Sequence, residues 1–180
     1  MGNLRKERIL AKRYVILDTS LNSFGNDDFL LLGLKTKGFA AGCPMLFGGT
    51  SDPKDGPPDS KEFSMNVIRR ELTEETIGHI QLNSAQRFHI YDDDLIVFAS
   101  SDFTFDGRVQ IGGEFSWIRK VSKGGLAREV PRSATRDGFA QILYGMTQDL
   151  EQPAPPKAFG EYLQSHSLDA VFKYFEKHRR

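Results

Sequence analysis

Residues 69–76 read Arg-Arg-Glu-Leu-Thr-Glu-Glu-Thr, and this stretch places Glu71, Glu74 and Glu75 at positions i, i+3 and i+4. Residues at these spacings are neighbours on the surface of an α-helix, so the three carboxylates share one side of any helix formed here. Like charges at this spacing cost a helix only about 0.2–0.5 kcal/mol per pair, so a solvated helix face is one interpretation. The other is a site for a hard divalent cation, Mg²⁺ or Mn²⁺, which takes oxygen ligands.

The segment around this stretch has the periodicity of an amphipathic helix. Ser60 is a residue type that is favoured at the N-cap of a helix. At about 100° per residue, Met65, Ile68 and Leu72 form one apolar stripe, and the glutamates lie beside it. The sequence therefore predicts a helix that begins near Ser60, packs by this stripe and carries the acidic cluster on the neighbouring face.

Strand-like patterns precede and follow this predicted helix. Apolar runs separated by Asn, Gly and Asp are typical of β-strands joined by short connections. Asp92, Asp93 and Asp94 separate two such runs and indicate a solvated turn. We expect strands in residues 13–21, 27–36, 86–91, 95–101 and 114–121, and a further short strand that ends at Gly48 and Gly49.

Two helical segments are predicted toward the C-terminus. Residues 134–150 carry four apolar side chains at helical spacing, Phe139, Ile142, Leu143 and Met146. Residues 152–156 (QPAPP) indicate a linker, and residues 158–180 indicate a further helical segment with a basic end. Its apolar face, which includes Phe172 and Phe175, is expected to pack on its own domain or on a second subunit, which leaves a homodimer open.

The spacing of residues over a longer stretch, 56–75, distinguishes between the two interpretations of the acidic cluster. Reading from Gly56, the chain gives Gly, five residues, Glu62, seven residues, Arg70-Glu71-Leu72, one residue and Glu74-Glu75. This pattern resembles the signature of the Nudix hydrolase family, and the intervals between its arginine and its glutamates are specific. The resemblance favours a metal-binding cluster over a solvated face.

The chain departs from the family signature at two places. The family has a glycine two residues after the last glutamate, whereas this chain has Ile77 there and Gly78 one step later, so we expect the helix to run one residue longer. The family's Gly-Gly pair usually ends the strand before the signature, and here Gly48 and Gly49 stand further upstream. We interpret Gly49 as the structural counterpart of the signature's first glycine and residues 51–60 as containing an insertion.

The resemblance implies a fold of the α/β class, an α/β/α sandwich around a mixed β-sheet. It covers residues 13–150; residues 1–12 are predicted to form an N-terminal arm, and residues 151–180 a linker and a C-terminal helical extension. A chain of 180 residues with 39% apolar and 27% charged residues is typical of a globular protein, for which we expect one core domain.

The resemblance also implies Mg²⁺-dependent hydrolysis of a nucleoside diphosphate linked to another moiety, with Mn²⁺ able to substitute. Glu71, Glu74 and Glu75 would be the metal ligands, with Glu74 and Glu75 the strongest catalytic candidates. Arg70 is expected to orient a glutamate through a charge-assisted hydrogen bond. The general base near the attacking water would be Glu114 or one of the helix glutamates.

Three further residues are expected to bind the substrate or to position the site. They are Gly48, Gly49 and Glu62. Glu62 is nearly opposite Glu71 on a helical wheel, so we expect it to position the helix start or an outer ligand.

The other moiety of the substrate stays open. ADP-ribose or another nucleotide sugar, a dinucleotide and a nucleoside triphosphate all fit the resemblance. Removal of a cap from RNA is a further variant, favoured by the basic residues 4–13 and 175–180, although a net charge of +0 argues against extensive phosphate contacts. The alternative is not an enzyme: it is a catalytically silent Nudix-like module with a nucleotide-binding or regulatory role.

The cysteine content and the apolar runs suggest the compartment. Cys43 is the single cysteine and cannot form an internal disulfide, and the first residues lack the apolar segment of a signal peptide. The longest apolar runs are far shorter than the about 20 residues that cross a bilayer. We therefore expect a cytoplasmic protein whose partner is a small-molecule nucleotide.

Overall fold

The computed structural model describes residues 11–92, 94–148 and 156–179 of the chain. Within them lie the strands β1 (Lys12–Asp18), β2 (Phe29–Lys35), β3 (Pro44–Met45), β4 (Phe47–Thr50), β5 (Ile80–Asp92), β6 (Leu95–Phe105) and β7 (Phe115–Ser122). The helices are α1 (Phe63–Thr76), α2 (Lys123–Glu129), α3 (Arg136–Thr147), α4 (Pro156–Leu163) and α5 (His166–His178), and a short 3₁₀ helix, η1 (Pro53–Asp55), precedes α1.

The strands form one mixed sheet. Its order is β3-β2-β1-β6-β5, with β4 paired to β1 and β7 paired to β2 beside that path. β1 and β6 run parallel, and the other pairs are antiparallel. In the turn between β5 and β6, Asp92 Oδ1 accepts hydrogen bonds from the N–H groups of Asp94 and Leu95, as expected for an acidic turn, while Asp93 lies outside the described residues.

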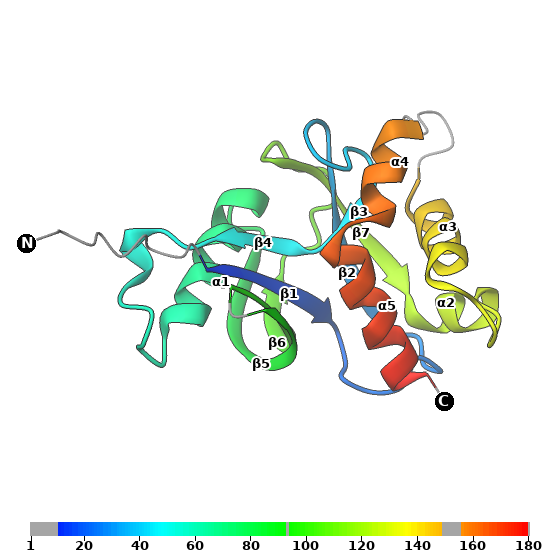
Figure 1. The fold of residues 1–180 in the computed structure, drawn as a ribbon, viewed down its shortest axis with the longest axis horizontal. Helices are drawn as coiled ribbons and strands as arrows, with labels where there is room; N and C mark the ends of the chain where they lie inside the picture. The colour runs from blue at the N-terminus through cyan, green and yellow to red at the C-terminus, as the bar shows by residue number, and fades with distance from the viewer. Residues whose placement is uncertain (1–10, 93, 149–155, 180) are drawn as a thin grey trace, which may run out of the picture.

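Alternating side chains along the strands build one core on each face of the sheet. On β1, Val15 and Leu17 lie in the core that includes Ile68 and Leu72 of α1, whereas Ile16 lies in the core with residues of α3 and α5. Figure 1 shows helices α2 to α5 gathered on one side of the sheet and α1 on the other. The predicted α/β/α sandwich around a mixed sheet is confirmed.

Helix α1 begins later than Ser60, so the predicted start is wrong. Its first residue is Phe63, and Glu62 takes the N-cap position without a side-chain capping bond. Ser60 lies in a turn in which its N–H donates to the carbonyl of Pro57 and its own carbonyl accepts from the N–H of Phe63. This additional turn after the proline-rich loop delays the helix by three residues.

Helix α1 ends at Thr76, so the expectation of a longer helix is also wrong. Ile77 adopts the left-handed conformation of a C-cap, with φ 51° and ψ 41°, and its N–H donates to the carbonyl of Thr73. The N–H of Gly78 donates to the same carbonyl. Ile77 therefore stands where helices usually place glycine.

The C-terminal helices share a core with the sheet. Phe175 of α5 is fully buried, and its ring centroid lies 5.2 Å from that of Phe139 in α3 and 5.0 Å from that of Phe24. The apolar face of α5 thus packs on its own domain. No described helix has the length and apolar character needed to cross a membrane.

Helices α2 and α3 differ in how well the sequence indicated them. α3 follows the N-cap Thr135 and lies within the predicted residues 134–150, of which the last two are outside the described residues. α2 was not expected; it begins after Ser122, whose hydroxyl accepts a hydrogen bond from the N–H of Gly125. The predicted linker and most of the predicted N-terminal arm also lie outside the described residues.

Candidate active site

Two glycines of β4 lie next to the acidic residues of α1. Gly48 has φ +133°, and a Cβ there would lie 2.1 Å from the carbonyl oxygen of Arg13 on β1. A Cβ on Gly49 would lie 2.6 Å from the carboxyl group of Glu71 on α1. Gly48 is therefore required by the backbone of β1, whereas a side chain at position 49 would press on the end of the flexible Glu71 side chain. Gly56 closes η1 with φ +96°, a conformation that favours glycine, and an added Cβ there would meet no atom within 4 Å.

Glu75 is buried at the C-terminal end of α1. Only 2% of its surface is exposed, and its Oε2 accepts a hydrogen bond of 2.8 Å from the N–H of Gly48. Burial raises the pKa of Glu75 to about 9, and the charges of Glu71 and Glu114 act in the same direction, although Gly48 and Lys35 favour the charged form. Without an added cation, this carboxyl group holds its proton at neutral pH.

Further ionisable groups lie within electrostatic reach of Glu75. Burial raises the pKa of Glu71, with Arg70 acting against it and Glu114 adding to it. Tyr14, which pairs with Gly48 across β1 and β4, has a pKa raised by burial and by the charges of Glu75, Glu71 and Glu114. The glycine pair is therefore surrounded by carboxylates from α1 and from the segment before β7.

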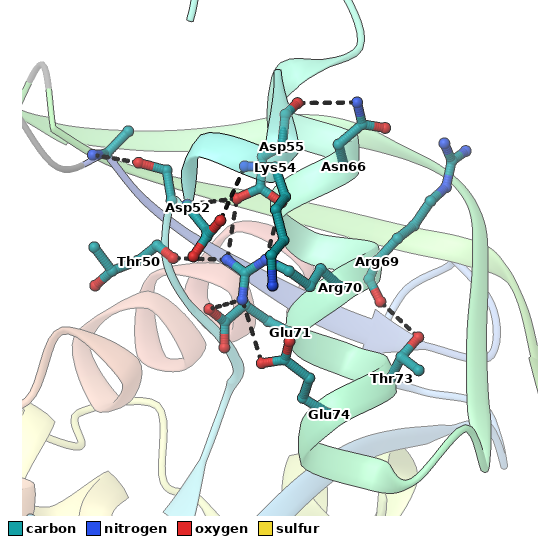
Figure 2. A network of polar contacts seen from close by, with 12 residues as sticks. Thr50, Asp52, Lys54, Asp55, Asn66, Arg69, Arg70, Glu71, Thr73 and Glu74 are labelled. Carbon is teal, nitrogen blue, oxygen red and sulfur yellow. Dashed lines mark hydrogen bonds and ion pairs between the residues drawn. The ribbon is translucent and has the colours of Figure 1, made fainter. Parts of the chain in front are cut away.

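Arg70 connects the acidic residues of α1 to the loop before it. Its Nε and Nη2 donate to the two carboxylate oxygens of Asp55 at 2.9 and 3.0 Å, and Nη2 also donates to the carbonyl of Thr50 at 2.8 Å. Nη1 lies 2.9 Å from Glu71 Oε1 and 3.3 Å from Glu74 Oε2. Figure 2 shows this guanidinium between Asp55 on one side and the two glutamates on the other.

Asp55 is a site residue that the sequence analysis missed. It is 2% exposed, and hydrogen bonds from Arg70 and from the N–H of Asp52 outweigh burial and lower its pKa. Asp52 and Asp55 form a capping box at η1. The spacing of Asp52 and Asp55 around Pro53 is the sequence signal for this capping box. It was missed because the segment is rich in proline and was interpreted as an irregular loop.

Glu114 and Lys35 lie at the open side of the cluster. Glu114 Oε1 accepts a hydrogen bond of 2.7 Å from Lys35 Nζ, and the carboxylate is mostly exposed. The charge of Glu114 contributes to the raised pKa values of Glu71 and Glu75, so Glu114 lies within electrostatic reach of both. Lys35 was not among the predicted site residues.

Glu74 and Glu62 lie further from the glycine pair. The Glu74 side chain is 62% exposed and turns toward Arg70. The Glu62 side chain is 70% exposed, and its nearest cation is Arg69 Nη1 at 3.8 Å. The structure thus brings together Glu71, Glu75, Gly48 and Gly49, with Arg70 behind Glu71, and leaves Glu62 apart.

The chemistry of these donors fits a hard divalent cation, although the ligand set is not assembled in advance. Within the described part of the chain, no three acidic, histidine or cysteine side chains are already grouped closely enough to hold a metal ion. Arg70 forms ion pairs with Glu71 and Glu74, and the N–H of Gly48 donates to Glu75. The three carboxylates are therefore bound to separate groups of the chain instead of facing one common point. Burial is the largest cause of the raised pKa values of Glu71 and Glu75, and a bound cation would favour the charged form of both carboxylates.

Comparisons with known proteins give structural likenesses and no family match. No protein-family model matches the chain, and no curated protein matches it. Among solved structures, it is similar to a MutT Nudix hydrolase from Burkholderia pseudomallei, with 19% identity, a TM-score of 0.40 and coverage of 76% of this chain and 98% of that one. It is also similar to the E. coli ORF135 protein, with 17% identity, a TM-score of 0.42 and coverage of 96% and 94%.

A third similar structure is the Nudix domain of NrtR from Shewanella oneidensis, complexed with ADP ribose. It shares 14% identity and a TM-score of 0.42, and the match covers 81% of this chain and 91% of that domain. Because the identities reach only 19% and the TM-scores only 0.42, these likenesses assign neither an activity nor a substrate to the chain.

Proposed function

We propose that the chain is a Nudix-type hydrolase that cleaves the diphosphate linkage of a nucleoside diphosphate joined to another moiety. One observation carries the proposal: Glu75 is a buried carboxyl group at the glycine pair, with Glu71 beside it and Glu114 within electrostatic reach. Gathering charged carboxylates in a buried place is unfavourable unless a cation joins them. A diphosphate brings further negative charge and so increases the need for the same cation.

Glu71 and Glu75 would hold Mg²⁺ at the glycine pair, and Glu74 would join them on leaving Arg70. Mg²⁺ suits such oxygen ligands, and Mn²⁺ would substitute for it. When bound, the metal neutralises charge on the diphosphate and makes water a stronger acid.

The remaining roles fall to groups of the chain itself. The N–H of Gly48 is already bound to Glu75, so it orients a carboxyl group instead of contacting the substrate. Arg70, which is fixed by Asp55, holds Glu71 through an ion pair of 2.9 Å. Glu114 is exposed on the open side and is our candidate for accepting the proton of the attacking water.

The competing function is a catalytically silent module that binds a nucleotide. The observation that favours it is the engagement of Glu71 and Glu74 by Arg70, which leaves no three carboxylates grouped for a metal in the described residues. Removal of a cap from RNA is a variant of the leading proposal, since it would use the same linkage and the same carboxylates.

The test is product release from a substrate panel in Mg²⁺ or Mn²⁺. The panel comprises ADP-ribose, other nucleotide sugars, dinucleotides, nucleoside triphosphates and capped RNA. We expect one class to be cleaved, and Glu75→Gln to reduce that rate by at least about 100-fold while the fold is retained. Glu62→Gln is the matched control, because Glu62 lies on the same segment but is 70% exposed and apart from the cluster. If nothing in the panel is cleaved while a nucleotide still binds, the silent module replaces the hydrolase.

A further inference from the structure

Three side chains from the C-terminal part of the chain bind the backbone of residues 40–46. Glu161 of α4 accepts a hydrogen bond of 2.7 Å at Oε2 from the N–H of Ala40. Gln148, just after α3, donates from Nε2 to the carbonyl of Gly42 at 2.8 Å. Ser167 of α5 accepts at Oγ from the N–H of Leu46 at 3.3 Å. A segment between two strands is thus held by three separate elements.

The conformation of this segment needs such support. Ala40 is fully buried and has φ +53°, a left-handed conformation that is unfavourable for a residue with a Cβ. Gly38 and Gly42 on either side also have positive φ, so the backbone reverses repeatedly. A buried N–H needs an acceptor, and Glu161 supplies it for Ala40.

The held segment connects two parts of the candidate active site. Near its start, the N–H of Gly42 donates to the carbonyl of Lys35 at 2.8 Å, and the Lys35 side chain binds Glu114. At its end, Leu46 is followed by Phe47 and then by Gly48, whose N–H binds Glu75. Because Gly48 follows this segment by only two residues, a shift of residues 40–46 would displace the N–H that orients Glu75.

We propose that Glu161 is a positioning residue, and that α4, α5 and Gln148 after α3 form a clamp that sets Gly48 and Gly49 against the glutamates of α1. The clamp consists of the contacts of Glu161, Gln148 and Ser167 with residues 40–46. The expected effect of the clamp on kcat rests on the proposed function. Its expected effect on the position of Gly48 and Gly49 does not. The C-terminal helices are then required for the geometry of the site through these backbone contacts.

The experiment compares Glu161→Ala with Glu161→Gln in the full chain. Glu161→Ala removes the acceptor for Ala40, so the amide signals of Gly48 and Gly49 shift in ¹H–¹⁵N spectra, and kcat falls on the order of 10- to 100-fold with a smaller change in KM. Glu161→Gln keeps an acceptor oxygen and restores both readouts. Lys157→Ala is the matched control: Lys157 is 89% exposed and lies 4.0 Å from Glu161 Oε1, so its removal alters the charge but not the bond to Ala40.

If folded Glu161→Ala keeps the wild-type Gly48 signal and kcat, the clamp is overturned. It is also overturned if Lys157→Ala changes the Gly48 signal and kcat as much as Glu161→Ala does. Ser167→Ala removes the acceptor for Leu46 and provides the same comparison if Glu161→Ala does not fold. The spectra do not depend on turnover. If the wild type cleaves no substrate, the proposed function fails while the Gly48 signal still decides the clamp.

Discussion

Ile77 adopts a conformation at the end of α1 that suits glycine better than a β-branched residue. Its φ is 51°, and its side chain is 56% exposed, so truncation loses little burial. We predict that Ile77→Gly raises the free energy of unfolding by about 1 kcal/mol, measured by urea denaturation. Gly78→Ala, at φ 74°, should change it in the opposite direction. A lower stability of Ile77→Gly would contradict the assignment of strain to this residue.

Cys43 is a buried thiol that should react slowly in the folded chain. Burial, followed by the charge of Glu161, raises its pKa to about 12, and the thiolate is the reactive form. Because the folded-state pKa lies above the ordinary value of about 8.5, the group stabilises the fold below that pH, and the contribution is lost as the pH rises toward the folded value. At pH 8, iodoacetamide should therefore modify Cys43 quickly in urea and slowly in buffer, as followed by mass spectrometry. Rapid modification of the folded chain would show that the thiol is accessible.

At the scale of elements, the link between η1 and α1 depends on the pair of Asp55 and Arg70. We predict that Asp55→Asn lowers the free energy of unfolding by about 2 kcal/mol, since a two-point contact with a charged partner is lost in a largely buried place. The lowered pKa of Asp55 means that its contribution is present above its ordinary pKa and is lost as the pH falls through the folded value. Chemical denaturation at pH 7 and pH 3 measures both effects, with the exposed Asp59→Asn as control. Equal stability of Asp55→Asn and wild type at pH 7 would refute the linking role.

The sequence predicted elements well where one short-range pattern dominates. The spacing of Ile68 and Leu72 indicated the buried face of α1, and apolar runs separated by turn residues indicated β1 and β2. Helix α2 was missed because Gly124 and Gly125 have low helix propensity, and this short helix is stabilised by the capping bond of Ser122, the buried ion pair of Lys123 with Asp18 and the burial of Leu126 in the core. Tertiary packing decides such an element, and packing is not visible in local sequence.

At the scale of the whole molecule, the sequence indicated the composition of the candidate site better than its surroundings. The spacing of Glu71 and Glu75 is sufficient to place both on one side of a helix, and the structure adds that Gly48 lies against the backbone of β1. The sequence could not show that Arg70 binds Asp55, or that α4 and α5 hold residues 40–46. An apolar helix face specifies that it must be covered, but it does not specify which surface covers it.

The most direct test of a cation held by the glutamates is the dependence of the cleavage rate on Mg²⁺ concentration. The substrate is the panel member that the wild type cleaves, and wild type and Glu71→Gln are compared at a fixed substrate concentration. If Glu71 is a metal ligand, the wild-type rate rises with Mg²⁺ to saturation and vanishes with a chelator. Glu71→Gln should then need at least about tenfold more Mg²⁺ for half-saturation. Cleavage that persists in the chelator, or identical Mg²⁺ curves for the two proteins, would contradict a metal site at the glycine pair.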